Sequence, residues 1–234
     1  MAMRFKIFDQ VADLSYGISE KSDGAMELAK AGLAEAKHRS DFFTRQGIDP
    51  AKTISLRQPH SAIVKKVGAD DLGKVAANVD GLVADAAGLI LTVTVADCFP
   101  IYFFNQVSRA VGLVHSGWRG TAANIAGEAV KVMPGNPTDV IAGIGPGIQG
   151  CHFEIKEDIL EKFFQYPEAI NHHGNKIFID LPKIISRQLI SAGLKHQNIE
   201  NCGECTYCLK EKYFSFRRDK PKSVEAMLAY IGLL

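Results

Sequence analysis

The chain has 234 residues, of which 47% are hydrophobic and 23% charged, and its formal net charge is +1. This composition excludes a disordered or fibrous protein, and the small charge gives no sign of a protein that binds nucleic acid through its phosphates. No apolar run reaches the roughly 18 residues of a membrane helix, and the N-terminus lacks the apolar core of a signal peptide. We therefore expect a cytoplasmic protein with no membrane partner, whose five cysteines are thiols or metal ligands.

The spacing of apolar residues predicts a mixture of helices and strands. A helix is predicted over residues 22–46, and strands follow near residues 53–56 and 62–67. Short apolar runs bounded by polar or turn-forming residues predict further strands at residues 81–84, 89–95, 101–104, 110–114 and 140–144. The remaining predicted elements are helices at residues 121–132, 157–164 and 181–192, and a final strand or helix at 225–234.

These predicted strands and helices do not alternate strictly along the chain. We therefore expect an α+β fold rather than a doubly wound one, with mixed β-sheets flanked by helices. Because no repeat, linker or low-complexity tract interrupts residues 1–234, we expect one compact domain.

An aspartate and a cysteine stand side by side where the apolar run of residues 89–95 ends. Residues 94–100 are Thr-Val-Ala-Asp-Cys-Phe-Pro, which places Asp97 and Cys98 at a strand end. Strand ends are rigid and open to solvent, and reactive groups placed there suggest a site. The alternative is that Cys98 is a small buried hydrophobic residue.

A glycine-containing turn follows the run of residues 110–114. Residues 115–120 are His-Ser-Gly-Trp-Arg-Gly, so His115 ends a strand and Arg119 lies near the start of a helix. Such a turn offers backbone N–H groups and a guanidinium to an anion. The alternative is a structural turn with Trp118, the only tryptophan, packed into the core.

A third candidate, His60, lies in a loop between two predicted strands. Together, His60, Cys98 and His115 supply two imidazoles and one thiolate, which suits zinc with a fourth position open to water or substrate. Their spacing matches no local metal motif. The same residues also suit a Cys98 nucleophile with a histidine base.

The order of these motifs resembles the YfiH-like family, also called the laccase-domain or multicopper polyphenol oxidase family. The resemblance covers about residues 55–220. It rests on these segments: Gln58-Pro59-His60, Asp80-Gly81-Leu82-Val83-Ala84-Asp85, the stretch from Thr94 to Pro100, the stretch from His115 to Gly120, Gly145-Pro146-Gly147-Ile148, Cys205-Thr206 and the stretch from Phe214 to Asp219.

The resemblance implies one zinc ion at the active site, held by His60, Cys98 and His115. The activities attributed to the family are phosphorolysis of purine nucleosides and methylthioadenosine, adenosine deamination, copper-dependent phenol oxidation and editing of peptidoglycan precursors. The residues present help to rank these activities. Copper is an alternative ion for a His/His/Cys set, but a multicopper oxidase needs many more histidines than the seven of this chain.

Phosphorolysis needs a pocket for phosphate and for a purine nucleoside. Arg119 is the first candidate for phosphate binding, with Arg217 and Arg218 as further candidates, because guanidinium groups bind phosphate in a bidentate manner. Asp97 is the candidate for proton transfer or for orienting a ligand. The aromatic residues considered for stacking on a purine are Trp118, Phe99 and Tyr102.

A second cysteine motif lies outside these segments. Cys202, Cys205 and Cys208 have the C-x-x-C-x-x-C spacing of part of an iron–sulfur or zinc site. No cysteine follows them, so Cys151 or a histidine would have to complete the site, and the alternative is a loop with incidental thiols. His172 and His173 are expected to be surface residues of a hairpin.

We therefore expect an enzyme, a zinc-dependent purine nucleoside phosphorylase that acts on adenosine, inosine or methylthioadenosine, with adenosine deaminase as a further activity. The sequence leaves alternatives open. One is an amide hydrolase of peptidoglycan precursors with Cys98 as nucleophile, and another is a copper-dependent polyphenol oxidase. A third is a non-catalytic metal or redox sensor built on the C-x-x-C-x-x-C motif.

Overall fold

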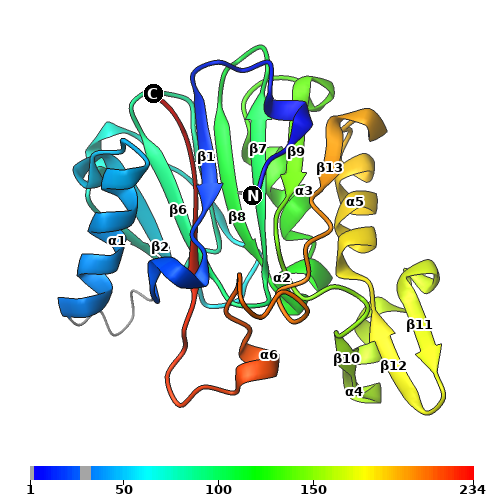
Figure 1. The fold of residues 1–234 in the computed structure, drawn as a ribbon. Coiled ribbons are helices and arrows are strands. Elements are labelled where there is room, and N and C mark those ends of the chain that lie inside the picture. Colours follow the sequence, from blue (N-terminus) through cyan, green and yellow to red (C-terminus); the bar gives the residue numbers. More distant parts are fainter. Residues whose placement is uncertain (1–2, 27–32) are drawn as a thin grey trace.

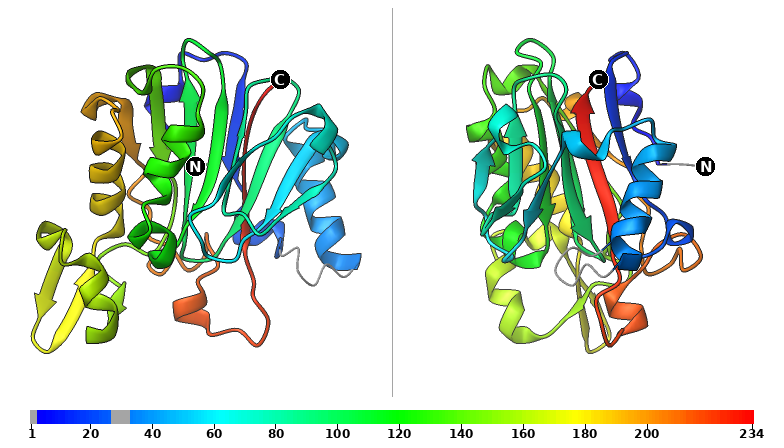
Figure 2. Two further views of the ribbon diagram at one scale, coloured as in Figure 1. Left: turned by 180° about the vertical axis from the view of Figure 1, so that it is seen from behind. Right: turned by 90° about the vertical axis from the view of Figure 1, so that its left-hand side faces the viewer.

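Two large mixed β-sheets pack face to face, and helices cover their outer faces (Figures 1 and 2). The computed structural model describes residues 3–26 and 33–234. The sheets share an apolar core to which both contribute; Leu91 and Ile231 come from one sheet, and Leu113 from the other. The result is the α+β fold in one compact domain that the sequence predicts.

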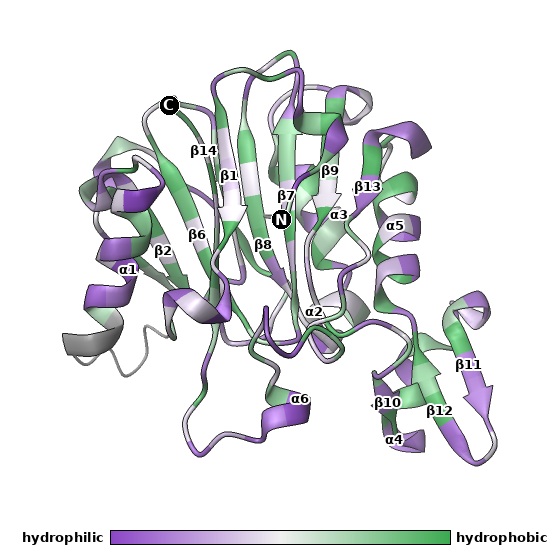
Figure 3. Ribbon diagram, in the orientation of Figure 1, coloured by the Kyte–Doolittle hydropathy of each residue, from purple (hydrophilic) through white to green (hydrophobic). Residues whose placement is uncertain are grey.

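The larger sheet carries most of the predicted apolar runs. Its strand order is β13 (Ile199–Asn201), β9 (Val140–Ile144), β7 (Phe99–Asn105), β8 (Val111–Ser116), β5 (Gly81–Ala84) and β3 (Val64–Lys66). Every residue of β7 and β8 is buried, because sheet packs on one face and helix on the other. Strands covered on both faces are mostly apolar along their length (Figure 3). This pattern allowed the strands to be predicted from the sequence.

The second sheet joins the two ends of the chain. Its order is β1 (Leu14–Ile18), β14 (Met227–Leu233), β6 (Ile90–Val95), β2 (Thr53–Arg57) and β4 (Val75–Ala77). The C-terminal segment is therefore a strand, one of the two predicted alternatives. It lies between β1 and β6, antiparallel to both.

A small third sheet projects from the lower corner of the molecule in Figure 1. It consists of β10 (Glu154–Ile155), β12 (Lys176–Ile179) and β11 (Ile170–His173). His172 and His173 are exposed at the end of this β11–β12 hairpin, as predicted.

The helices of the described chain are α1 (Leu33–Arg45), α2 (Trp118–Ala122), α3 (Ile125–Val132), α4 (Glu157–Leu160), α5 (Leu181–Ser191) and α6 (Phe216–Asp219). Helices α3 and α5 cover the larger sheet, whereas α1 packs Phe42 and Phe43 against Tyr230 of the smaller one. Within the described residues, no helix has the length and apolar character to cross a membrane.

Two predicted helices differ from the structure. Over residues 22–46, the described helix is α1 at Leu33–Arg45, and residues 27–32 lie outside the described part. Before them, a short 3-10 helix at Lys21–Asp23 ends at Gly24 with φ of 86°, so the helix does not begin at residue 22. The helix predicted at residues 121–132 is two helices. It breaks at Asn124, whose φ of 61° is left-handed and whose side chain caps α3 by accepting from the Gly127 N–H.

Candidate metal centre and pocket

Three side chains that the sequence singled out converge at one end of the two large sheets. His60 lies in the loop after β2, Cys98 in the turn between β6 and β7, and His115 on β8. Their ligand atoms all lie within 4.8 Å of one another. The rings of His60 and His115 meet edge to face at 4.9 Å. Antiparallel pairing explains the convergence, because Pro100 of β7 lies opposite His115 of β8.

The backbone around these donors is unusual in two ways. His60 and Asp97 both adopt left-handed φ values, 65° and 78°, which are uncommon for residues other than glycine. Gly117 passes so close to the cluster that a Cβ atom there would lie 2.7 Å from the Cys98 sulfur. Only glycine therefore lets the turn approach the thiol at this distance, and the conformation serves the site rather than the sheet.

Asp80 forms hydrogen bonds with the side chain of His115 and the main chain of His60. This carboxylate is fully buried; one oxygen accepts from His115 Nδ1 at 2.9 Å and from the His60 N–H at 3.1 Å. The other oxygen accepts from the Ser61 N–H and hydroxyl, while the Asp80 carbonyl accepts from the His115 N–H. Because Nδ1 of His115 is engaged, its Nε2 is the nitrogen left to bind a metal.

Sequence reasoning assigned Asp80 no role. A signal was present, since Asp80 is a charged residue directly before the apolar run of β5 and within a motif of the resembled family. The pairing that makes it useful was not readable, because β5 lies beside β8 only in the folded sheet.

The thiol and the buried imidazole stabilise each other's charged forms. Burial alone would raise the pKa of Cys98, but the charge of His115 and hydrogen bonds from His115 and His60 outweigh it and lower the pKa to about 6. Burial likewise disfavours the charged form of His115, yet Cys98 and Asp80 raise its pKa to about 9. Without a metal the pair is therefore a thiolate and an imidazolium at neutral pH.

We expect the metal-free protein to show this thiolate in its alkylation kinetics. The rate of Cys98 modification by iodoacetamide should rise with a midpoint near pH 6 and be nearly constant above pH 7, because the thiolate is the nucleophile. Peptide mapping by mass spectrometry measures this rate residue by residue. Cys151 is an internal control, since burial and the nearby thiols raise its pKa to about 12. A midpoint for Cys98 near that of an ordinary thiol, about 8.5, would contradict the described pairing.

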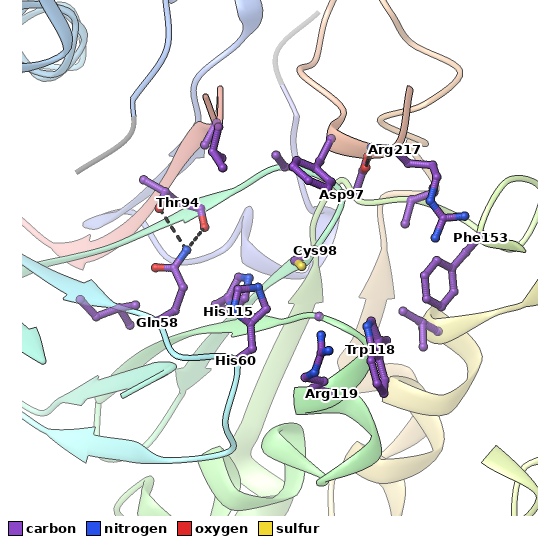
Figure 4. A pocket seen from close by; sticks show the side chains of 18 of the residues that line it. Gln58, His60, Thr94, Asp97, Cys98, His115, Trp118, Arg119, Phe153 and Arg217 are labelled. Carbon is purple, nitrogen blue, oxygen red and sulfur yellow. Dashed lines mark hydrogen bonds between the residues drawn. The ribbon is translucent and has the colours of Figure 1, made fainter. Parts of the chain in front are cut away.

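The three donors lie at the wall of a cavity of about 600 Å³ (Figure 4). This volume falls within the usual range for small-molecule sites. Figure 4 shows Trp118 and Arg119 on one side of the cavity and Asp97 and Arg217 on the other. Its remaining wall is largely apolar and includes Leu56, Ile148, Phe153, Leu181, Phe216 and Val224.

The cavity has a marked excess of positive groups. Arg57, Arg119 and Arg217 line it, whereas Asp97 is the one carboxylate among its described lining residues. Arg57 was missed in the sequence, although it directly precedes the Gln58-Pro59-His60 motif. The Arg119 guanidinium lies 4.2 Å from the centre of the Trp118 ring, and Arg217 donates to the Glu154 carbonyl while lying over Phe153. The lining favours an anionic ligand with an aromatic or apolar part.

Asp97 lines the cavity with both carboxylate oxygens engaged. One accepts from the Thr206 hydroxyl at 2.6 Å and the other from the Arg217 N–H at 2.7 Å. These bonds tie the turn before β7 to α6, which carries Arg217.

Three residues considered for ligand binding lie elsewhere. Arg218 does not line the cavity; it donates to the carbonyls of Thr206, Tyr207 and Tyr213 and pairs with Asp219, so it braces a loop. Phe99 and Tyr102 are fully buried in the cores on the two faces of β7 and cannot stack on a ligand. Trp118 alone of the three aromatic candidates lines the cavity.

The donor chemistry fits one metal ion. Two imidazoles and a thiolate whose ligand atoms lie within 4.8 Å of one another are a donor set suited to a tetrahedral ion, with a fourth position left for another ligand. The hydrogen bond from His115 to Asp80 is the arrangement that orients metal-binding histidines in general.

Comparison with known proteins identifies the family of this chain. Residues 16–233 match the family described as "Multi-copper polyphenol oxidoreductase laccase". "Purine nucleoside phosphorylase YlmD" of Geobacillus stearothermophilus is 34% identical over 246 residues, which cover 95% of this chain and 89% of that protein. "Purine nucleoside phosphorylase YfiH" of Escherichia coli is 30% identical over 189 residues, and the match covers 79% of this chain and 75% of that protein.

The likeness extends to three-dimensional structure. The crystal structure of Bacillus licheniformis hypothetical protein YfiH matches with a TM-score of 0.91 at 26% identity, over 97% of this chain and 95% of that one. Sequence and fold therefore agree over nearly the whole length, and the chain belongs to the multi-copper polyphenol oxidoreductase laccase family, whose curated relatives include the YfiH and YlmD proteins.

Proposed function

We propose that this protein is a zinc-dependent purine nucleoside phosphorylase whose metal is held by His60, Cys98 and His115. The observation that carries the proposal is the position of this three-donor set in the wall of a cavity lined by three arginines. The names of the relatives support the same reaction. The free thiols suit a reducing compartment, and we place the enzyme in the cytoplasm.

The residues of the cavity divide between the two substrates. Arg119 and Arg217 are placed to bind phosphate, and Trp118 offers a ring on which the purine can stack. Bound zinc would supply a Lewis acid that polarises a substrate oxygen. Asp80 fixes the orientation of His115, and Asp97 fixes the N-terminal turn of α6 and thereby Arg217.

Phosphorolysis fits the cavity better than the other reactions attributed to the family. Deamination of a purine needs a free carboxyl group that shuttles protons. Asp97, the one carboxylate in the described lining, instead accepts two hydrogen bonds. Oxidation of phenols by several copper ions needs several histidine-rich centres. Within the described residues, the groups of side chains close enough to hold a metal ion contain three histidines in total.

Product analysis tests the proposed reaction. The purified protein is incubated with adenosine, inosine or methylthioadenosine, each with and without phosphate, and the products are separated by chromatography. Phosphorolysis gives a free purine base and a sugar 1-phosphate only when phosphate is present. Absence of free base from every nucleoside in the presence of phosphate, or turnover that survives removal of the metal, would refute the proposal.

Replacing Arg119 with alanine should weaken phosphate binding more than nucleoside binding. Charge-assisted hydrogen bonds contribute about 1.5–3 kcal/mol, so we expect the KM for phosphate to rise roughly 10- to 100-fold. Steady-state kinetics with each substrate varied in turn measures this difference. Arg187→Ala is a matched control, because Arg187 also lies over an aromatic ring, that of Tyr166, but does not line the cavity. Equal effects of both substitutions would remove Arg119 from the phosphate site.

A further inference from the structure

A second group of metal-type side chains lies apart from His60, Cys98 and His115. Cys151, His152, Cys205 and Cys208 place their ligand atoms within 4.8 Å of one another; we name them the Cys3His cluster. The cluster joins the segment just before β10 to the loop that follows β13. Cys205 lies 54 residues after Cys151 along the chain, so the fold, not a local motif, brings the two segments together.

The distances within the cluster match those of a tetrahedral zinc site. The Cys151 sulfur lies 3.8 Å from that of Cys205 and 3.9 Å from that of Cys208. With a Zn–S bond of about 2.3 Å, a regular tetrahedron separates its sulfurs by about 3.8 Å. The His152 Nδ1 atom lies 3.1 Å from Cys151 Sγ and 3.4 Å from Cys208 Sγ, near the roughly 3.5 Å that an N/S edge requires.

The surroundings hold the four side chains in place. The His152 ring stacks on Tyr207 at 4.1 Å with an angle of 16° between the planes, which leaves Nδ1 directed at the sulfurs. Cys205 is buried and its main chain pairs with Gly147, whereas Cys151 and Cys208 are exposed and leave the cluster open to an ion from solvent. An iron–sulfur cluster distributes its four ligands over two or more iron ions, whereas all four ligand atoms here lie within 4.8 Å of one another, which suits a single ion.

Cys202 is not a member of the cluster, although the sequence motif includes it. Its side chain packs against the core between the two large sheets, and its N–H donates to the Ile144 carbonyl. The structure therefore replaces Cys202 with Cys151 and adds His152 as the fourth ligand.

We propose that the Cys3His cluster is a second zinc site, structural in role and separate from the active-site metal. Four protein ligands fill the coordination shell, and a closed shell is the mark of a structural rather than a catalytic zinc. Binding converts thiols to thiolates and releases their protons to solvent.

The position of the cluster indicates what the ion stabilises. His152 precedes Phe153, which forms part of the cavity wall, and Cys205 precedes Thr206, whose hydroxyl donates to Asp97. An ion at the cluster links these two segments directly. It therefore fixes one wall of the cavity without contacting the ligand.

Metal stoichiometry in purified variants tests the proposal. The proteins are produced with added zinc, purified anaerobically with a reductant and analysed for zinc by mass spectrometry. We expect two zinc ions per wild-type chain, one in Cys98→Ala, one in the Cys151→Ser/Cys208→Ser double variant, and none in the combination of all three. Cys202→Ser is the matched control within the same motif and should retain two.

A spectroscopic measurement distinguishes the two sites independently of activity. Cobalt(II) in place of zinc gives sulfur-to-metal charge-transfer absorption whose intensity increases with the number of thiolate ligands, three here against one at the active site. We expect the Cys151→Ser/Cys208→Ser variant to lose most of this absorption, while its circular dichroism spectrum shows that it remains folded. Zinc should still raise the melting temperature of Cys98→Ala, whose Cys3His cluster is intact. It should no longer do so when the Cys151→Ser/Cys208→Ser substitutions are added to Cys98→Ala.

Three outcomes would overturn the proposal. One is a single zinc per wild-type chain under these conditions, with the three thiols and the imidazole of the cluster free of metal. Another is retention of the second zinc by the double variant together with its loss from Cys202→Ser. The third is a disulfide among Cys151, Cys205 and Cys208 that persists in reductant, since oxidised sulfurs cannot bind the ion as thiolates.

Discussion

The Cys98→Ala variant should lose phosphorolysis and the active-site zinc together. Cys98 supplies the one thiolate of the three-donor set, and the two imidazoles alone bind zinc more weakly. Enzymes accelerate their reactions by at least about 10⁶-fold, so removal of the metal should lower kcat/KM by roughly 10³-fold or more. Initial rates of phosphate-dependent base release, with zinc measured in the same samples, check both losses.

The control for this variant is Cys202→Ala, which removes a half-buried thiol that lies in neither metal-type cluster. It should keep the rate and the zinc content of the wild type. If Cys98→Ala retained its turnover, the chemistry would have to lie outside the three-donor set. If it lost turnover but kept its zinc, Cys98 would act as a nucleophile, as in an amide hydrolase.

Replacing Asp80 with asparagine should damage both the metal site and the fold. The carboxylate is fully buried and accepts hydrogen bonds from His115, His60 and Ser61. Loss of a partner that orients a metal ligand typically costs about 10- to 100-fold in metal affinity. In the metal-free protein the variant also removes one of the two buried groups that stabilise the His115 imidazolium, the other being the Cys98 thiolate, which should lower the free energy of unfolding by about 3 kcal/mol.

Competition with a zinc chelator measures the affinity, and urea unfolding of the metal-free protein measures the stability. Asp85→Asn is the matched control, because Asp85 directly follows β5, the strand that Asp80 directly precedes, but is exposed and pairs with Lys66. It should change neither quantity appreciably. Wild-type zinc affinity in Asp80→Asn would mean that His115 is oriented by the sheet alone.

The pattern of apolar residues predicted the buried strands well, for a physical reason. Strands such as β7 and β8 are covered on both faces, so their central positions are apolar, and their polar residues Asn105, His115 and Ser116 stand at the strand ends. Short strands at the edges, including β4 and β10, carry no such signal and were not predicted. The break at Asn124 was missed because a left-handed residue that caps the next helix does not disturb the apolar periodicity.

The sequence predicted the three candidate metal ligands but not the residues that surround and orient them. Cys98 and His115 stand out because each lies at the end of an apolar run and carries metal-binding chemistry, whereas His60 lies in a loop and gained weight only as part of the set and through the family resemblance. Asp80, Arg57 and Phe153 join them only through sheet pairing and loop packing, which a single sequence does not specify. The same limit explains why the local motif included Cys202, which the fold turns toward the core, and left Cys151 or a histidine only as a possible completion of the site.

The most direct test of the proposed function is a zinc titration of metal-stripped protein, followed by phosphate-dependent cleavage of inosine and adenosine. The Cys151→Ser/Cys208→Ser variant suits this measurement, because its one remaining metal-type cluster in the described residues is His60, Cys98 and His115. We predict that the rate rises in proportion to bound zinc, reaches its plateau at one ion per chain and falls to background without phosphate. Full occupancy of this site with no phosphate-dependent release of base from either nucleoside, in this variant and in the wild type alike, would contradict the proposed function.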